Sequence, residues 1–250
     1  MTTTGTIPIQ EVSLKNLRVA CSSCSLRELC LPLGLSSEEM IQLETLISQR
    51  TRIKKGEQLY SAGDPMSSLY AVRLGFFKMS VVSEDGREQV TGFQMAGELL
   101  GMDAISSDAH TCSAIALEDS EVCEIPFTEL EQLSRNIPSL QHNFYKVLSR
   151  EIVRDHGVMM LLGNMKAEER LAAFLINLSQ RFALRGYSSK NFILRMTREE
   201  IGSYLGLKLE TISRSFSKFQ DQGFIRVSNK EVEITDLPAL KAILSGCPEK

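Results

Sequence analysis

The sequence predicts an α+β fold in which an antiparallel β-roll, a long helix and a winged helix-turn-helix follow one another. Three observations support this prediction. Residues 51–127 consist of short β-rich runs between turn signals, a helical pattern continues from Pro138 to about Leu162, and two short helical segments with a hairpin follow residue 197. Strands at such close and regular spacing are typical of an antiparallel barrel or roll.

The composition is that of a globular chain. Of the 250 residues, 43% are hydrophobic and 24% are charged, which excludes disordered and collagen-like proteins. No apolar run is long enough to span a membrane, and the first twenty residues lack the compact apolar stretch of a secretory signal. We therefore expect a cytoplasmic protein with no membrane partner, whose six cysteines are not structural disulfides.

Four segments are predicted along the chain. The first is polar and then cysteine-rich, without a helical or strand period, and we interpret it as an arm. A capping box at Ser36-Ser37-Glu38-Glu39 then starts a helix with apolar Met40, Leu43 and Ile47. The predicted segments are the cysteine-rich arm at 1–35, the β-roll at 36–137, the long helix at 138–165 and the winged helix-turn-helix at 166–250.

The arm carries the pattern Cys21-x2-Cys24-x5-Cys30, which places three thiols within ten residues. Three thiolates on one loop can hold a single metal centre, with a fourth ligand from elsewhere. The chain has no second paired Cys/His group, which favours an iron–sulfur cluster over zinc, although zinc and free thiols stay open alternatives. Spacing alone does not separate a [4Fe–4S] from a [2Fe–2S] centre. The remaining cysteines are Cys112, Cys123 and Cys247.

The long helix carries a heptad seam. Its members are spaced by 4, 3, 4 and 3 residues, which is typical of a parallel two-stranded homodimer. One of them, Asp155, would face its own copy across the two-fold axis, so we expect a dimer that is kept weak. The alternative is that the helix packs on its own roll with Asp155 at the edge. The seam consists of Leu148, Ile152, Asp155, Met159 and Leu162.

The charge and the last helices indicate a nucleic-acid-binding module. Residues 166–250 carry 14 Lys and Arg against 10 Asp and Glu, a balance of +4, whereas residues 1–165 carry 14 against 21, a balance of −7. A capping box begins at Thr197, Gly206 allows a tight turn, and helices are predicted over 197–205 and 209–219. A hairpin around residues 228–230 would form the wing.

The second of these helices is predicted to read DNA. Ile212, Phe216 and Phe219 recur with a helical period and form its core face. The outward face then presents side chains that can bind base edges in a major groove, such as an arginine for guanine and a glutamate for cytosine. Lys208 stands at the N-cap, where a serine or threonine is expected, so a DNA phosphate would satisfy the free N–H groups there. The outward residues are Glu210, Ser213, Arg214 and Ser217.

Over essentially its whole length the chain resembles the cyclic-AMP receptor/FNR (CRP/FNR) family of bacterial transcription regulators, and most of all its oxygen-sensing fumarate-and-nitrate-reduction branch. The resemblance implies a jelly roll like that of cyclic-nucleotide-binding domains, a [4Fe–4S] cluster with Cys123 as fourth ligand, and contact with RNA polymerase. It also implies that Glu210, Ser213 and Arg214 read a TTGAT-type half-site in an inverted repeat. The motifs that carry it are Cys21-x2-Cys24-x5-Cys30, Val122-Cys123-Glu124-Ile125-Pro126-Phe127, Ala167-Glu168-Glu169-Arg170-Leu171-Ala172 and Glu210-Thr211-Ile212-Ser213-Arg214.

The family's other branch binds cyclic AMP through an Arg-Ser-Ala motif, and here that motif reads Cys112-Ser113-Ala114. Without the arginine a cyclic phosphodiester loses its main charge partner, so no cyclic nucleotide is expected. The leading hypothesis is a non-enzymatic activator or repressor that dimerises on DNA without oxygen and is switched off when oxygen disassembles the cluster. The rivals are a redox or electron-transfer iron–sulfur protein and a nucleotide-gated regulator with zinc in the arm.

Overall fold

The computed structural model describes residues 21–47 and 49–245. Its first helix, α1 (Ser37–Leu46), begins where the sequence predicts. Ser36 is the N-cap: its backbone N–H donates to Glu39 Oε2 at 2.8 Å, and its hydroxyl oxygen accepts from the Glu39 N–H at 3.3 Å. The apolar face of α1 is buried, with Leu43 only 1% exposed.

The β-roll is formed by two four-stranded antiparallel sheets within the described residues, with strand orders β1-β8-β3-β6 and β2-β7-β4-β5. This confirms the predicted fold class. Phe77, Leu69 and Val122 are almost fully buried in the roll. The strands are β1 (Gln49–Ile53), β2 (Gln58–Tyr60), β3 (Ser68–Leu74), β4 (Phe76–Val82), β5 (Glu88–Met95), β6 (Leu99–Leu100), β7 (Ser113–Ala116) and β8 (Ser120–Pro126).

Two helices follow the roll. Helix α2 (Phe127–Asn136), which the sequence prediction missed, buries Leu130 against the roll side of the molecule. Helix α3 (Pro138–Asn164) begins with Pro138 in its first turn, where the missing N–H costs nothing. Within the described residues no helix is both long enough and apolar enough to cross a membrane.

The C-terminal domain contains the predicted helix-turn-helix and wing. Its helices α4, α5 and α6 bury their apolar faces in one core, in which Ile212, Phe216 and Phe219 are at most 1% exposed. Strand β9 and helix α7 were not predicted. The elements are α4 (Ala167–Ala183), β9 (Asn191–Ile193), α5 (Arg198–Leu205), α6 (Leu209–Asp221), β10 (Ile225–Ser228), β11 (Glu231–Ile234) and α7 (Leu237–Ala242), and the sheet order is β10-β11-β9.

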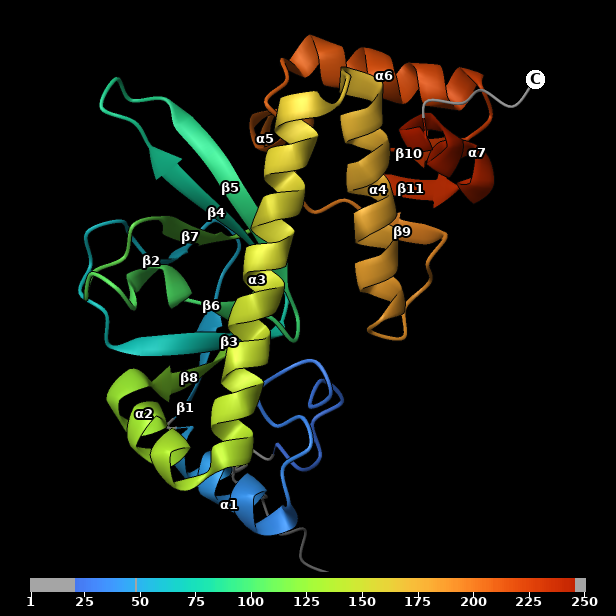
Figure 1. Ribbon diagram of the computed structural model, residues 1–250. Coiled ribbons are helices and arrows are strands. Elements are labelled where there is room, and N and C mark those ends of the chain that lie inside the picture. Colours follow the sequence, from blue (N-terminus) through green and yellow to red (C-terminus); the bar gives the residue numbers. More distant parts are fainter. Residues whose placement is uncertain (1–20, 48, 246–250) are drawn as a thin grey trace, which may run out of the picture.

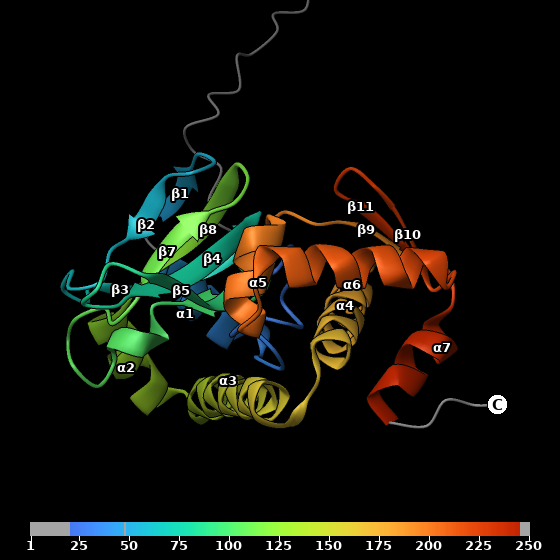
Figure 2. The ribbon, with the colours of Figure 1, turned by 90° about the horizontal axis from the view of Figure 1, so that it is seen from above.

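Helix α3 forms a column along the molecule. The roll lies beside it, α1 and the cysteine arm lie at its start, and the C-terminal domain lies at its end (Figure 1). Seen from above, α3 lies at an outer edge of the molecule, and α6 runs across the middle of the view in front of α4 (Figure 2). The cysteine arm and α6, the helix predicted to read DNA and called the recognition helix below, therefore lie at opposite ends of α3.

Candidate functional site

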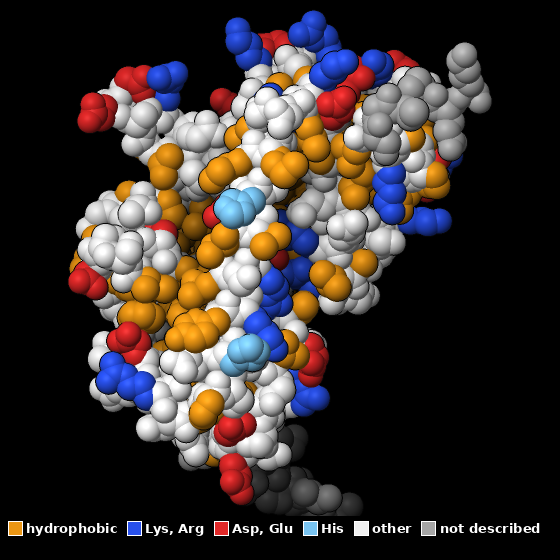
Figure 3. All heavy atoms as spheres, in the orientation of Figure 1, with side chains coloured by type: hydrophobic (Ala, Val, Ile, Leu, Met, Phe, Trp, Pro, Cys, Tyr) orange, Lys and Arg blue, Asp and Glu red, His pale blue; other side chains and the backbone are white. Residues whose placement is uncertain are grey.

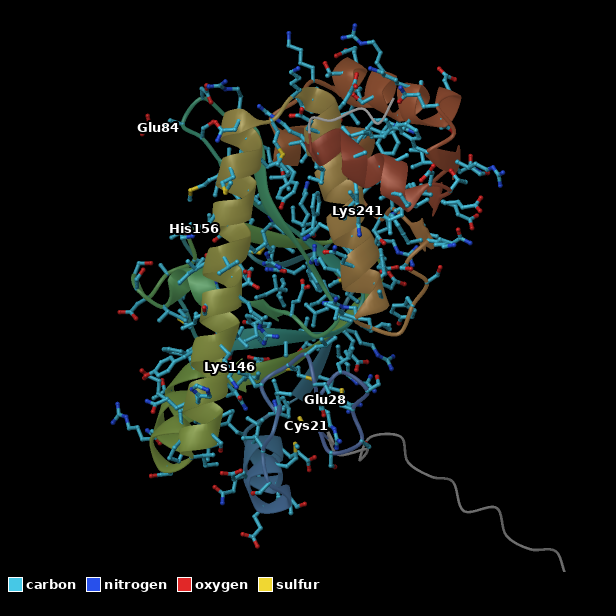
Figure 4. All side chains as sticks on the ribbon, turned by 45° about the vertical axis from the view of Figure 1, so that its right-hand side comes forward. Cys21, Glu28, Glu84, Lys146, His156 and Lys241 are labelled. Carbon is cyan, nitrogen blue, oxygen red and sulfur yellow. The ribbon has the colours of Figure 1, made fainter. Side chains whose placement is uncertain are left out.

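The cysteine arm is a series of turns packed against the roll. Leu31 is fully buried and belongs to the same core cluster as Leu43 of α1. Asn143 of α3 donates from its side-chain amide to the carbonyl oxygens of Leu31, at 3.3 Å, and Leu33. The Ser22 N–H donates to Glu44 Oε1 of α1 at 2.7 Å. These contacts hold residues 21–35 close to the start of α3 (Figure 4).

The four predicted ligands line one small cavity. Cys21, Cys24 and Cys30 come from the arm, and Cys123 comes from β8, where it pairs with Arg50 of β1 and Ala71 of β3. The cavity measures about 40 Å³. One segment of turns and one strand of the roll thus bring the four cysteines to a common cavity.

Cys112 is not part of this cavity. Cys112 is buried elsewhere in the roll, beside Asp103 and Tyr60. Cys247 lies outside the described residues.

The four-cysteine cavity disfavours free thiolates. Burial, followed by the neighbouring thiols, raises the pKa of Cys21 to about 12, and burial likewise raises the pKa of Cys30 to about 12 and that of Cys123 above its usual value. Several thiolates there require a cationic partner, and iron bound by cysteine sulfur is such a partner. The donor set therefore fits an iron–sulfur cluster. Over the described residues, no three His, Cys, Asp or Glu side chains form a ready site for a single metal ion.

Gly97, in the turn between β5 and β6, forms part of the wall of this cavity. It adopts φ +88°, and a Cβ there would lie 2.9 Å from the Leu29 Cβ of the arm. The other side of the same turn faces a cleft of about 500 Å³ between α3, α4 and the roll.

The residue after Gly97 is bound by three arginines. Glu98 accepts from Arg181 of α4 at 2.6 Å and from Arg185, in the turn after α4, at 2.7 Å, and it lies 3.6 Å from Arg154 of α3. Arg185 also donates to the Ala96 carbonyl at 2.5 Å. This group, the Glu98 cluster, ties the C-terminal domain to the roll, and Lys and Arg side chains are seen together in this hollow in Figure 3. The sequence gives no signal for it, because the partners lie on elements far apart in the chain.

The N-terminal half of α6 faces solvent. Lys208, Glu210, Arg214 and Ser217 are exposed and Ser213 is half-buried. Lys208 caps the helix without a side-chain hydrogen bond, as its residue type predicts. The face opposite the core is thus available to a ligand. One contact was not predicted: the Arg198 guanidinium lies 4.0 Å from the centre of the Phe216 ring and braces α5 on α6.

The predicted seam on α3 is largely exposed. Ile152 is 54%, Met159 66% and Leu162 36% exposed, Asp155 is exposed, and Leu148 is half-buried. The surface that α3 packs on its own chain is a different one, which includes Leu140, Val147 and Leu161. Figure 3 shows hydrophobic side chains along the solvent side of α3, which leaves an apolar face for a partner helix.

Comparison with known proteins gives consistent relatives. The chain matches the Crp-like helix-turn-helix domain over residues 169–243 and the cyclic nucleotide-binding domain over residues 50–136. It is 48% identical to the transcriptional regulatory protein btr of Bordetella pertussis, over 90% of this chain and 93% of the relative. It is 45% identical to the fumarate and nitrate reduction regulatory protein of Escherichia coli K12, over 95% of both chains. The solved structure of FixK2 from Bradyrhizobium japonicum matches with a TM-score of 0.72 and 27% identity, over 78% of this chain and 96% of that one.

Proposed function

The chain belongs to the CRP/FNR family of DNA-binding transcription regulators, which are not enzymes, and from this premise we propose that it is an oxygen-responsive member. In this proposal it binds a [4Fe–4S] cluster, forms a homodimer through α3 and reads an inverted repeat with α6. The observation that carries the proposal is the four-cysteine cavity at one end of α3, with an exposed recognition helix at the other end.

Cys21, Cys24, Cys30 and Cys123 would hold the cluster. When bound, the cluster would be ligated by the four thiolates, and its reaction with oxygen would remove this ligation. In the arm, Leu26 and Leu31 line the cavity and limit the access of water. Burial raises the pKa values of the Cys21 and Cys30 thiols, so without the cluster these thiols favour their neutral form.

In this proposal, ligation of the cluster by the four cysteines stabilises the dimer. With the arm cysteines and Cys123 held together, residues 21–30 are tied to β8, and with the ligation lost only the arm's own contacts remain. Asp155 opposes the dimer, because two carboxylates about 4 Å apart repel by ~4 kcal/mol at an effective dielectric constant of ~20. A modest coupling between arm and seam is then sufficient, since a shift from 1:99 to 99:1 takes ~5.5 kcal/mol.

On DNA, we assign base contacts in a TTGAT-type half-site to Glu210, Ser213 and Arg214, with Ser217 alongside them, and a phosphate contact to Lys208. The exposure of Lys208, Glu210, Arg214 and Ser217, with Ser213 half-buried beside them, supports this assignment. Two protomers related by a two-fold axis would read the two halves of the inverted repeat. Contact with RNA polymerase is proposed from family membership.

We further propose that the roll senses no cyclic nucleotide. Beside Cys112, the Asp103 carboxylate accepts from the Thr111 N–H at 2.7 Å and the Cys112 N–H at 3.2 Å. A phosphodiester at this position would meet a negative charge in place of an arginine. In this proposal the roll serves as the scaffold that carries Cys123.

The test is purification without oxygen, followed by the absorption spectrum and by analysis of iron and acid-labile sulfide. Wild type should carry the iron–sulfur absorption and bind the inverted repeat, and Cys123→Ala should lose both. Cys112→Ala is the matched control, since Cys112 is also buried but outside the cavity, and it should behave as wild type. A colourless protein that contains zinc would reject the cluster, and a coloured protein without DNA affinity would favour the electron-transfer rival.

A further inference from the structure

Arg170 lies on α4, in a motif that neither the cluster nor the base contacts use. Its guanidinium donates three hydrogen bonds, all to backbone carbonyl oxygens. Nη2 reaches Leu162 at 2.8 Å, Nε reaches Met165 at 2.9 Å, and Nη1 reaches Leu205 at 3.0 Å. Leu162 is in the last turn of α3, and Leu205 is the last residue of α5. One side chain therefore joins the ends of two helices.

The chemistry suits an arginine. The last carbonyls of a helix have no partner within it, and they carry the negative end of the helix dipole. A planar guanidinium presents several N–H donors in fixed directions, so it can satisfy carbonyls from two helices and hold them at a set angle. A lysine, which is a point charge on a flexible stem, fixes no such angle.

A direct contact reinforces this joint. Gly206 ends α5 with φ +63°, and a Cβ on it would meet Leu162 Cδ2 at 3.3 Å and Arg170 Nη1 at 3.4 Å. Leu162 is the last residue of the predicted seam, so the end of the seam lies close to the turn between α5 and α6. The preceding Leu161 is 8% exposed and belongs to the core of the C-terminal domain.

We propose that Arg170 is a positioning residue that fixes the recognition helix relative to the dimer seam and thereby sets the half-site spacing that the dimer accepts. This inference rests on the proposed homodimer and inverted repeat. In such a dimer the separation of the two recognition helices has to match the separation of the half-sites. One added base pair moves the half-sites apart by about 3.4 Å and rotates one around the axis, which a stiff joint resists.

The experiment measures Kd, without oxygen, for duplexes that carry two TTGAT-type half-sites with spacers of different length. The spacer that wild type binds most tightly is the reference, and spacers one base pair shorter and longer are compared with it. Wild type should lose at least about tenfold in affinity on either change, which is ~1.4 kcal/mol. Arg170→Met should lose about threefold or less, and Arg170→Lys should fall between the two.

Two controls separate position from stability. Glu168→Gln removes the Glu168–Lys218 ion pair, which also joins α4 to α6 but is exposed and screened by solvent, so the variant should keep the wild-type spacer dependence. A base change within one half-site should cost every variant the same factor, since Arg170 touches no base.

If wild type and Arg170→Met show equal spacer dependence, the inference is overturned. If Arg170→Met does not fold, Arg170→Lys takes its place, and wild-type spacer dependence in that variant also overturns the inference. Failure of wild type to bind any of these duplexes rejects the proposed operator itself, which is a distinct result.

Discussion

The two ends of α3 are built differently. At the start, the arm is held by the buried Leu31, the side chain of Asn143 and the Ser22–Glu44 hydrogen bond, and the described residues 21–35 form no helix or strand. At the end, Arg170 joins the termini of α3 and α5. Between the two ends, the Glu98 cluster ties the C-terminal domain to the roll. A segment of turns responds readily to a ligand, whereas ion pairs and shared cores move as one body. The contrast indicates that a conformational change on ligand binding begins at the cysteine end of α3, and that the DNA end passes this change to α6 as a rigid body.

The largest expected effect is on the connection between the C-terminal domain and the roll. Glu98→Leu leaves Arg181 and Arg185, which are 12% and 4% exposed, without their carboxylate. We expect a loss of about 3–5 kcal/mol in the free energy of unfolding in urea, because unpaired buried charges remain. Glu118→Leu is the matched control: its pair with Arg195 also joins roll and C-terminal domain but is more exposed, so it should cost at most about 1 kcal/mol. Similar losses in both variants would contradict a special role for Glu98.

The same cluster predicts a pH dependence. Burial opposes ionisation of Glu98, but Arg181, Arg154 and Arg185 together hold the pKa of its carboxyl below the usual 4.5. A carboxyl with a lowered folded-state pKa stabilises fully above its unfolded value and loses that contribution as pH falls through the folded one. Urea unfolding between pH 6 and about pH 3 should therefore show a stability loss in wild type that is smaller in Glu98→Gln.

Between the two ends, Asp155→Ala tests whether the seam is the switch. Removal of a repulsion of up to ~4 kcal/mol should give a dimer in air and without the cluster. Sedimentation under oxygen, beside wild type, measures this. A variant that stays monomeric would show that Asp155 does not control the dimer and that the arm acts elsewhere.

In the C-terminal domain, Arg214→Ala tests whether α6 reads bases. We expect a loss of about 1–3 kcal/mol in DNA-binding free energy and a relaxed preference at one guanine. Titration of duplexes substituted at single positions measures this. An equal loss on specific and non-specific DNA would make Arg214 a phosphate contact instead.

The smallest effect is expected at Lys208. If Lys208 neutralises a phosphate at the N-terminus of α6, Lys208→Ala should weaken binding to all sequences and lower the salt dependence of log Kd by about 1. The measurement is Kd against salt concentration on specific and unrelated duplexes. Sequence-selective weakening would place Lys208 on a base.

Local patterns predicted much of this molecule. The capping boxes at Ser36 and Thr197 marked helix starts, and the period of Ile212, Phe216 and Phe219 marked a buried face. Each of these signals depends on residues only a few positions apart in the chain, so each can be recognised from the sequence. The predicted segment boundaries stay a prediction, with α3 observed from Pro138 to Asn164.

The missed features have a common physical reason. Glu98 and Arg181 are 83 residues apart, so only the folded chain brings them together. The acceptors of Arg170 are backbone carbonyls, which every residue has and which leave no mark on residue type. For the cysteines, spacing grouped the first three, but the choice of Cys123 over Cys112 came from family resemblance and needs the register of β8.

Gly97 has a consequence for how relatives of this chain diverge. Two independent conditions hold there, a left-handed backbone and a Cβ position 2.9 Å from that of Leu29. Only a glycine at position 29 would relieve the second condition, since every other residue also has a Cβ, and it would not relieve the first. Compensation by pairs of substitutions is therefore blocked. The sequence alignment of functional relatives should therefore show glycine at position 97 even where position 29 drifts. The residues of the arm can then vary among relatives, whereas the glycine in the cavity wall cannot.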